Sequence, residues 1–171
     1  MDLREYLQSN TAATKNFFYQ NVRRITGKDP RISRGEKVYV AGFLTMYAEL
    51  SSIRPTLPHF SNASEIKEFF AALSNTTGKP EYWEAGGEQT LFVNGFFRGD
   101  TEDKSVAERA ELYDYLGYSF YHTAHKLSVD PERRELRARM AGNFPLWTET
   151  CWGLHLSLQN NRYAINKGQA N

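Results

Sequence analysis

The segment from Val106 to Leu127 is the longest uninterrupted helical pattern in this chain of 171 residues, and it constrains the fold more than any other stretch. Its apolar or small residues recur at alternating steps of four and three, so they share one side of an α-helix. They are Val106, Ala110, Tyr113, Gly117, Phe120, Ala124 and Leu127. A long helix with one apolar side buries that side against other elements, so the pattern predicts a central helix.

The start and the middle of this helix carry two further signals. Ser105 and Glu108 have the spacing of a capping box, which predicts that the helix begins there. Gly117 stands within the apolar side, where glycine costs roughly 1 kcal/mol relative to alanine. We therefore expect another helix to cross close to Gly117 and to need the space that a side chain would fill.

A polar flank runs beside the apolar side and contains two closely spaced histidines. Its members are Glu111, Asp114, Tyr118, His122 and His125. Because His122 and His125 are three residues apart, both imidazoles can face one point, as in a metal or proton-transfer site. Asp114 lies roughly 12 Å from His122 along the axis, at about 1.5 Å per residue, so one ion cannot bind both. A complete site needs a carboxylate or histidine from another helix, and the alternative is a flank that faces solvent or a neighbouring helix.

The rest of the chain is also helical in pattern, so we predict an all-α, single-domain bundle of about six helices. We expect helices at 3–26, at 34–52, after residue 62, and at 88–98, 131–141 and 146–163, with loops at 53–61 and 74–87. The domain spans residues 1–171, with an ordered core at 3–163 and a polar tail at 164–171. Residues 88–98 can be read as a buried strand, but apolar pairs four residues apart favour a short helix.

Glu49 is a carboxylate on a predicted helix that is apolar nearly all round, which is typical of a buried helix. Ser33 and Glu36 form the capping box that starts this helix. A buried carboxylate is costly unless it is paired, so Glu49 could be a catalytic acid or a metal ligand shared with His122 and His125. The alternative is a carboxylate at the helix end that is exposed or bonded to an arginine.

Several aromatic residues fall outside the apolar sides of the predicted helices. They include Tyr82, Trp83, Tyr115 and Trp152. Aromatic residues are enriched at protein interfaces, so these four are interface candidates, although Tyr82 and Trp83 could instead plug the end of the bundle. Cys151 and His155 are four residues apart and could form a nucleophile pair, but the apolar neighbours of Cys151 indicate a buried filler.

The composition argues against several classes of protein. Lys and Arg number 21 and Asp and Glu number 20, so the charge balance favours neither nucleic acid nor an anionic membrane as a partner. No stretch approaches 18 apolar residues, so we expect no membrane span. The single cysteine and the lack of an apolar run in residues 1–10 lead us to expect a cytoplasmic protein.

Three segments resemble an arrangement found in an uncharacterised family of bacterial all-helical proteins. They are GEKVYVAGFLTMY at 35–47, TLFVNGFF at 90–97 and ELYDYLGYSFYHTA at 111–124. The shared arrangement is an apolar mid-chain helix, then an aliphatic run that closes in G-F-F, then a tyrosine-rich helix with an internal glycine. The resemblance covers roughly residues 35–158 and implies a helix at 90–97 within a single domain. No activity is attached to these motifs, so the resemblance implies no functional residue.

The common motifs for phosphate, dinucleotide, zinc-protease and serine-nucleophile sites are absent from the sequence. Our first hypothesis is a protein that acts through protein–protein contacts, as an adaptor or regulator, with a protein partner or by self-association. The second hypothesis is a helical metalloprotein or small-molecule enzyme that uses His122 and His125 with a carboxylate from another helix. We predict no cofactor, other than a divalent metal ion under the second hypothesis.

Overall fold

The computed structural model describes residues 11–49, 58–73, 77–99 and 102–168, which form seven α-helices and no β-strand. The helices are α2 (Thr11–Thr26), α3 (Arg34–Glu49), α4 (Ala63–Leu73), α5 (Pro80–Phe96), α6 (Lys104–Leu127), α7 (Pro131–Gly142) and α8 (Phe144–Gly168). The predicted all-α, single-domain fold is confirmed. The parts of the predicted helices at 3–10 and 50–52 lie outside the described residues. Within the described part of the chain, no helix has the length and apolar character that crossing a membrane requires.

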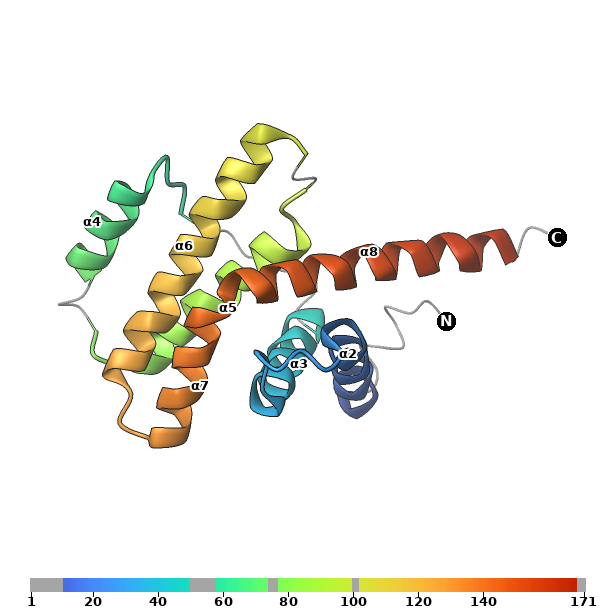
Figure 1. The fold of residues 1–171 in the computed structure, drawn as a ribbon, viewed down its shortest axis with the longest axis horizontal. Coiled ribbons are helices and arrows are strands. Elements are labelled where there is room, and N and C mark those ends of the chain that lie inside the picture. The colour runs from blue at the N-terminus through green and yellow to red at the C-terminus, as the bar shows by residue number, and fades with distance from the viewer. Residues whose placement is uncertain (1–10, 50–57, 74–76, 100–101, 169–171) are drawn as a thin grey trace.

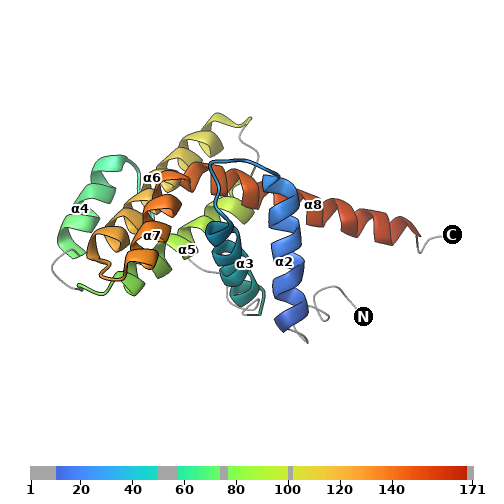
Figure 2. The ribbon, with the colours of Figure 1, turned by 60° about the horizontal axis from the view of Figure 1, so that its bottom comes forward.

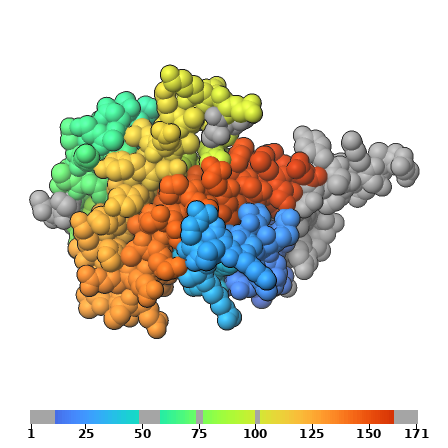
Figure 3. Space-filling model, in the orientation of Figure 1, coloured from blue at the N-terminus to red at the C-terminus, as the bar shows by residue number. Residues whose placement is uncertain are grey.

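Helix α6 lies at the centre of the described fold (Figure 1). α5 and α7 pack along it, α4 covers its outer side, and α8 crosses it. α2 and α3 form a hairpin that contacts α8 and α7 on the side of the protein away from α4 (Figures 1 and 2). In the space-filling view, the blue surface of this hairpin lies directly beside the orange surface of α7 (Figure 3). The fold thus brings α3 next to α7, although the two helices are far apart in the sequence.

Two adjacent glycines of α5 allow two adjacent rings of α6 to lie against its backbone. A Cβ atom on Gly86 would come within 2.4 Å of the Phe120 ring, and one on Gly87 would come within 2.6 Å of the Tyr121 ring. Phe120 packs with Trp83 in a cluster beside α4, whereas Tyr121 belongs to the larger core shared by α2, α3, α7 and α8. Helix α6 is therefore buried on more sides than its single apolar stripe predicts.

The expectation that another helix comes close to Gly117 is confirmed. The Phe144 ring, at the start of α8, occupies the space where a side chain at position 117 would lie, with Cζ 1.9 Å from a Cβ built there. The predicted cap of α6 needs a correction, because the N-cap is Asp103, whose carboxylate accepts a 2.8 Å hydrogen bond from the Ser105 N–H. The Asp103 carboxylate also accepts from the Ser105 hydroxyl, so Ser105 is a partner of the cap and lies inside the helix.

The predicted loop at 74–87 is wrong for residues 80–87, which form the first half of α5. Pro80 occupies the first turn, where its missing N–H removes no helical hydrogen bond, and the glycines are held by the rings packed on them. The predicted helix at 88–98 is confirmed as the second half of α5. The predicted break after α7 is also confirmed, but the predicted end of the last helix at residue 163 is wrong, because α8 continues to Gly168.

Glu36 joins α3 to α7 and α8. Its side chain is fully buried and accepts hydrogen bonds from the Ser33 N–H at 2.7 Å, Arg139 Nε at 3.0 Å and Asn143 Nδ2 at 2.8 Å. The Trp147 indole donates a fourth at 3.2 Å. The capping box of Ser33 and Glu36 is confirmed, and its carboxylate has the further role of positioning the α2–α3 hairpin against α7.

Candidate functional site

A cleft of about 480 Å³ lies between α3 on one wall and α5 and α7 on the other. Its apolar lining residues are Val38, Phe43, Met46 and Leu136. Its polar and charged lining residues are Lys15, Tyr39, Glu84, Glu88 and Arg133. Small organic ligands bind in concave sites of roughly 300–1,000 Å³ that combine an apolar wall with a few convergent polar groups. The volume of the cleft falls in this range, and its lining contains both kinds of residue, with five polar or charged side chains beside four apolar ones.

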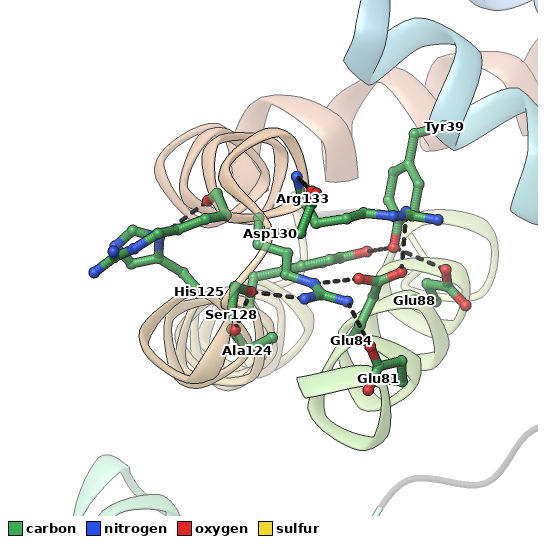
Figure 4. Close-up of polar contacts among 12 residues, drawn as sticks. Tyr39, Glu81, Glu84, Glu88, Ala124, His125, Ser128, Asp130 and Arg133 are labelled. Carbon is green, nitrogen blue, oxygen red and sulfur yellow. Dashed lines mark hydrogen bonds and ion pairs between the residues drawn. The ribbon is translucent and has the colours of Figure 1, made fainter. Parts of the chain in front are cut away.

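The acidic lining residues Glu84 and Glu88 belong to a row of three glutamates on one face of α5. Glu81, Glu84 and Glu88 follow one another at steps of three and four residues, so their carboxylates lie on the same side of the helix. In Figure 4 this side faces Tyr39 of α3 and Arg133 of α7. The start of α5 at Pro80 is what makes this row helical, so the row depends on the segment that the sequence pattern assigns to a loop.

Two arginines of α7, one helical turn apart, face this acidic row. The Asp130 side chain caps α7 by accepting a 2.7 Å hydrogen bond from the Arg133 N–H, and this fixes where the helix begins. Arg137 Nε donates to Glu84 Oε2, and Arg137 also lies 3.7 Å from Glu81. Arg133 lies 3.6 Å from the other oxygen of Glu84. The side chains of Arg137 and Glu84 are only 4% and 13% exposed, so this ion pair is largely shielded from water.

Glu88 is held by a hydrogen-bonded pair of tyrosines, of which Tyr39 lines the cleft and Tyr121 is fully buried. The Tyr39 hydroxyl donates a 2.7 Å hydrogen bond to Glu88 Oε1, and the Tyr121 hydroxyl lies 3.1 Å from the Tyr39 oxygen. Because the Tyr39 hydrogen is directed at the carboxylate, Tyr121 is the donor in the second bond when Glu88 is ionised. The result is a hydrogen-bonded chain from α6 through α3 to α5 that fixes the Glu88 side chain.

Burial changes the acidity of all three groups in this chain. Desolvation raises the pKa of Glu88, and the neighbouring Glu84 charge raises it further, while the Tyr39 hydrogen bond and Arg133 act in the opposite direction. Desolvation also raises the pKa of Tyr39 and of Tyr121 well above the ordinary tyrosine value. Both tyrosines therefore stay protonated near neutral pH and serve as donors.

The two histidines of the sequence-based candidate site do not line the cleft. Tyr118 stacks on His122 with ring centres 5.3 Å apart, and His122 lies 6.2 Å from His125. His125 Nδ1 is 3.0 Å from the Arg134 carbonyl oxygen, so this nitrogen carries the proton and donates. Desolvation, with smaller effects of Lys126 and His125, lowers the pKa of His122.

A metal site at His122 and His125 would need a further ligand. Among the described residues, no three His, Cys, Asp or Glu side chains gather closely enough to hold an ion. The Glu49 side chain, proposed from the sequence as the shared carboxylate, lies outside the described residues. Asp114 is engaged elsewhere, because it accepts hydrogen bonds from Asn94 and Thr148 at 2.9 and 2.7 Å. A smaller pocket of about 230 Å³ beside Tyr118 and His122 is lined by residues of α4 and α6.

The four interface candidates have different environments. Trp83 needs a correction: it is fully buried, it stacks on Phe70 with ring centres 5.3 Å apart, and no partner can reach it. It plugs the cluster between α4, α5 and α6, which is the alternative considered for it from the sequence. Tyr82 is 52% exposed, Tyr115 is half-buried, and Trp152 is half-buried.

The interpretation of Cys151 as a buried filler agrees with its environment. The Cys151 side chain is buried against the backbone of Gly95, and desolvation raises the pKa of its thiol to about 12. His155 stacks on Trp152, with ring centres 5.1 Å apart. A thiol with this pKa is not ionised near neutral pH, so Cys151 does not have the properties of a nucleophile.

The residues of the cleft do not stand out as a site in the sequence pattern. The available signal was the spacing of Glu81, Glu84 and Glu88 opposite a second charged series at Arg133 and Arg137. It was hidden because the acidic series begins in a segment with two adjacent glycines, which reads as a loop. No protein-family model, no curated protein and no solved structure matches this chain.

Proposed function

We propose that this protein binds a small organic molecule in the cleft between α3, α5 and α7. The observation that carries the proposal is the pairing of an apolar wall open to water with a fixed carboxylate. Val38 and Met46 on that wall are 41% and 42% exposed, which is high for large apolar side chains on a helix whose other side is core. A ligand that covered them would gain roughly 25 cal/mol of binding free energy for each Å² of apolar surface removed from water.

The internal contacts of the cleft favour a preformed site. Arg137 and Glu84 form a buried ion pair on one side, and the Tyr39 hydroxyl fixes Glu88 on the other. Preformed polar groups reduce the ordering cost of binding, because the side chains that recognise the ligand are already in place. The entropy lost on binding is therefore mainly that of the ligand itself and of the side chains at the rim of the cleft.

Gly42 allows a direct test of the site. It lines the cleft, and a Cβ atom built on it meets nothing within 4 Å. We would screen a fragment library by ligand-observed NMR against the full chain, and then against Gly42→Phe, which fills the cleft, and Gly42→Ala, which does not. We expect hits that bind the wild type and Gly42→Ala but not Gly42→Phe, with unchanged helical circular dichroism in all three. Hits that bind Gly42→Phe as well as they bind the wild type, or an absence of hits, would overturn the proposal.

A protein partner or self-association is the second candidate function, as an adaptor or regulator. The observation that favours it is the exposure of aromatic side chains, because Tyr82 of α5 and Tyr118 of α6 are 52% and 39% exposed. Light scattering after gel filtration would compare the wild type with Tyr82→Ser and Tyr118→Ser. Self-association requires an oligomer that one of these variants weakens, and a monomeric wild type at high concentration contradicts it. Both candidates are proposed for a cytoplasmic protein, because the chain has a single cysteine.

A further inference from the structure

We infer that the ligand of the cleft is a small organic cation, in which an ammonium or guanidinium group pairs with Glu88 and an apolar body covers Val38 and Met46. This inference rests on the proposed function and specifies its ligand class. It follows from the distribution of charges among the described residues around the cleft, from the hydrogen bonding of Glu88, and from the position of the apolar wall.

The two arginines of α7 make their ion pairs with Glu81 and Glu84, and Arg133 acts on Glu88 only over a longer distance. Arg137 is bonded to Glu84 and lies 3.7 Å from Glu81, and Arg133 lies 3.6 Å from Glu84. In the part of the chain that the structure describes, no Lys, Arg or His forms an ion pair with Glu88. Two guanidinium groups thus serve the first two carboxylates of the row, and the third faces the cleft with its charge uncompensated by an ion pair.

The hydrogen bonding of Glu88 leaves one oxygen for a ligand. Oε1 accepts from the Tyr39 hydroxyl at 2.7 Å, and among the described residues this is the hydrogen bond that the Glu88 side chain makes. A carboxylate has about four acceptor positions on its two oxygens, so Oε2 can receive a charged N–H donor without displacing Tyr39. A hydrogen bond to a charged donor is stronger than one between neutral groups.

The apolar wall lies where the body of such a cation would extend. Val38, Phe43 and Met46 come from α3, and Leu136 comes from α7, so both helices contribute apolar side chains to the cleft that Glu88 lines. Lys15 and Arg133 also line the cleft. Those two cations would attract a ligand carboxylate, so anionic and zwitterionic probes belong in the test beside the cation.

The test uses four probes that share one aromatic body. They are 2-phenylethylamine, the neutral 2-phenylethanol, the anionic 3-phenylpropanoate, and phenylalanine as the zwitterion, each titrated into the full chain by NMR. We expect the amine to bind most tightly and Glu88→Gln to weaken it roughly tenfold or more, because a hydrogen bond to a charged group is lost. Glutamine still accepts from Tyr39, so the site keeps its shape, and the affinity for phenylethanol should stay the same.

The matched control is Glu81→Gln. It makes the same chemical change on the same helix, but Glu81 does not line the cleft and its side chain is 75% exposed. Amine binding that falls equally in Glu81→Gln and Glu88→Gln overturns the inference, as does tighter binding of the alcohol, the anion or the zwitterion. In each of these cases the proposed function survives if Gly42→Phe still abolishes binding. Failure of all four probes and of the fragment library would instead remove the proposed function itself.

Discussion

The backbone of Gly87 in α5 lies directly against the ring of Tyr121 in α6, so that a Cβ atom at position 87 would come within 2.6 Å of ring carbon Cε2. This contact sets the separation of the two helices at the level of the cleft. The hydroxyl of the same tyrosine lies 3.1 Å from that of Tyr39, which in turn holds Glu88. A packing contact in the core and the position of the candidate ligand-binding carboxylate are therefore connected through one side chain.

Replacing Gly87 with alanine tests this contact. Alanine improves helix propensity by about 1 kcal/mol, but its methyl group collides with a fully buried ring that cannot swing away, and overpacking of this kind costs about 1–3 kcal/mol. We expect a net loss of up to about 2 kcal/mol in urea denaturation. The control is Gly153→Ala in α8, where the nearest atom would lie at an ordinary 3.8 Å, and which should gain stability. A Gly87→Ala variant as stable as Gly153→Ala would show that the ring is free to move.

Glu88 should make the folded protein less stable at high pH than a neutral side chain would. Its pKa is raised by burial and by Glu84, so the folded state binds the proton more tightly than the unfolded state does. Stability therefore falls as the pH rises from the ordinary pKa of 4.5 through the raised folded value. We expect Glu88→Gln to melt at a higher temperature than the wild type at pH 8, with a difference that shrinks at pH 4. A Glu88→Gln variant that is less stable at pH 8 would mean that the cleft already neutralises this carboxylate.

Glu36 should contribute stability with the opposite dependence on pH. Burial alone would raise its pKa, but the hydrogen bonds from Asn143, Ser33 and Trp147 outweigh burial and lower it. The contribution is thus complete above the ordinary value of 4.5 and is lost as the pH falls through the lowered folded pKa. We expect Glu36→Gln to cost about 1.5–3 kcal/mol at pH 7 and less at pH 3, measured by denaturant unfolding. Glu135→Gln on the exposed side of α7 should change little at either pH.

Cys151 should react with a thiol reagent only after the protein opens. With a pKa of about 12, about one thiol in 10⁴ is ionised at pH 8, and the side chain is buried as well. We expect the native protein to react with a disulfide reagent orders of magnitude more slowly than the protein unfolded in guanidinium chloride. The unfolded protein should react at once and release one equivalent of the reagent's thiol. Fast reaction of the native protein would contradict the packing of Cys151 against Gly95.

The local part of the fold could be predicted because its signals lie within a few residues of one another. The capping box of Ser33 and Glu36, the proline after Asp130 and the four-and-three spacing of α6 each depend on neighbours in sequence. The failures share a different cause. The helical state of Gly86 and Gly87 and the burial of Trp83 depend on rings that other segments supply.

By itself, the sequence determined that the chain is helical and that α6 is central, because the period of its apolar residues encodes which side of each helix avoids water. It also determined which residues lie close together within one helix, such as His122 and His125 on neighbouring turns. The tertiary structure decided which polar residues meet across helices, and it placed Glu88 beside Tyr39 and Arg137 beside Glu84. These residues are 49 and 53 positions apart, so the cleft comes from the way the α2–α3 hairpin and α7 pack around α5, which no local pattern encodes.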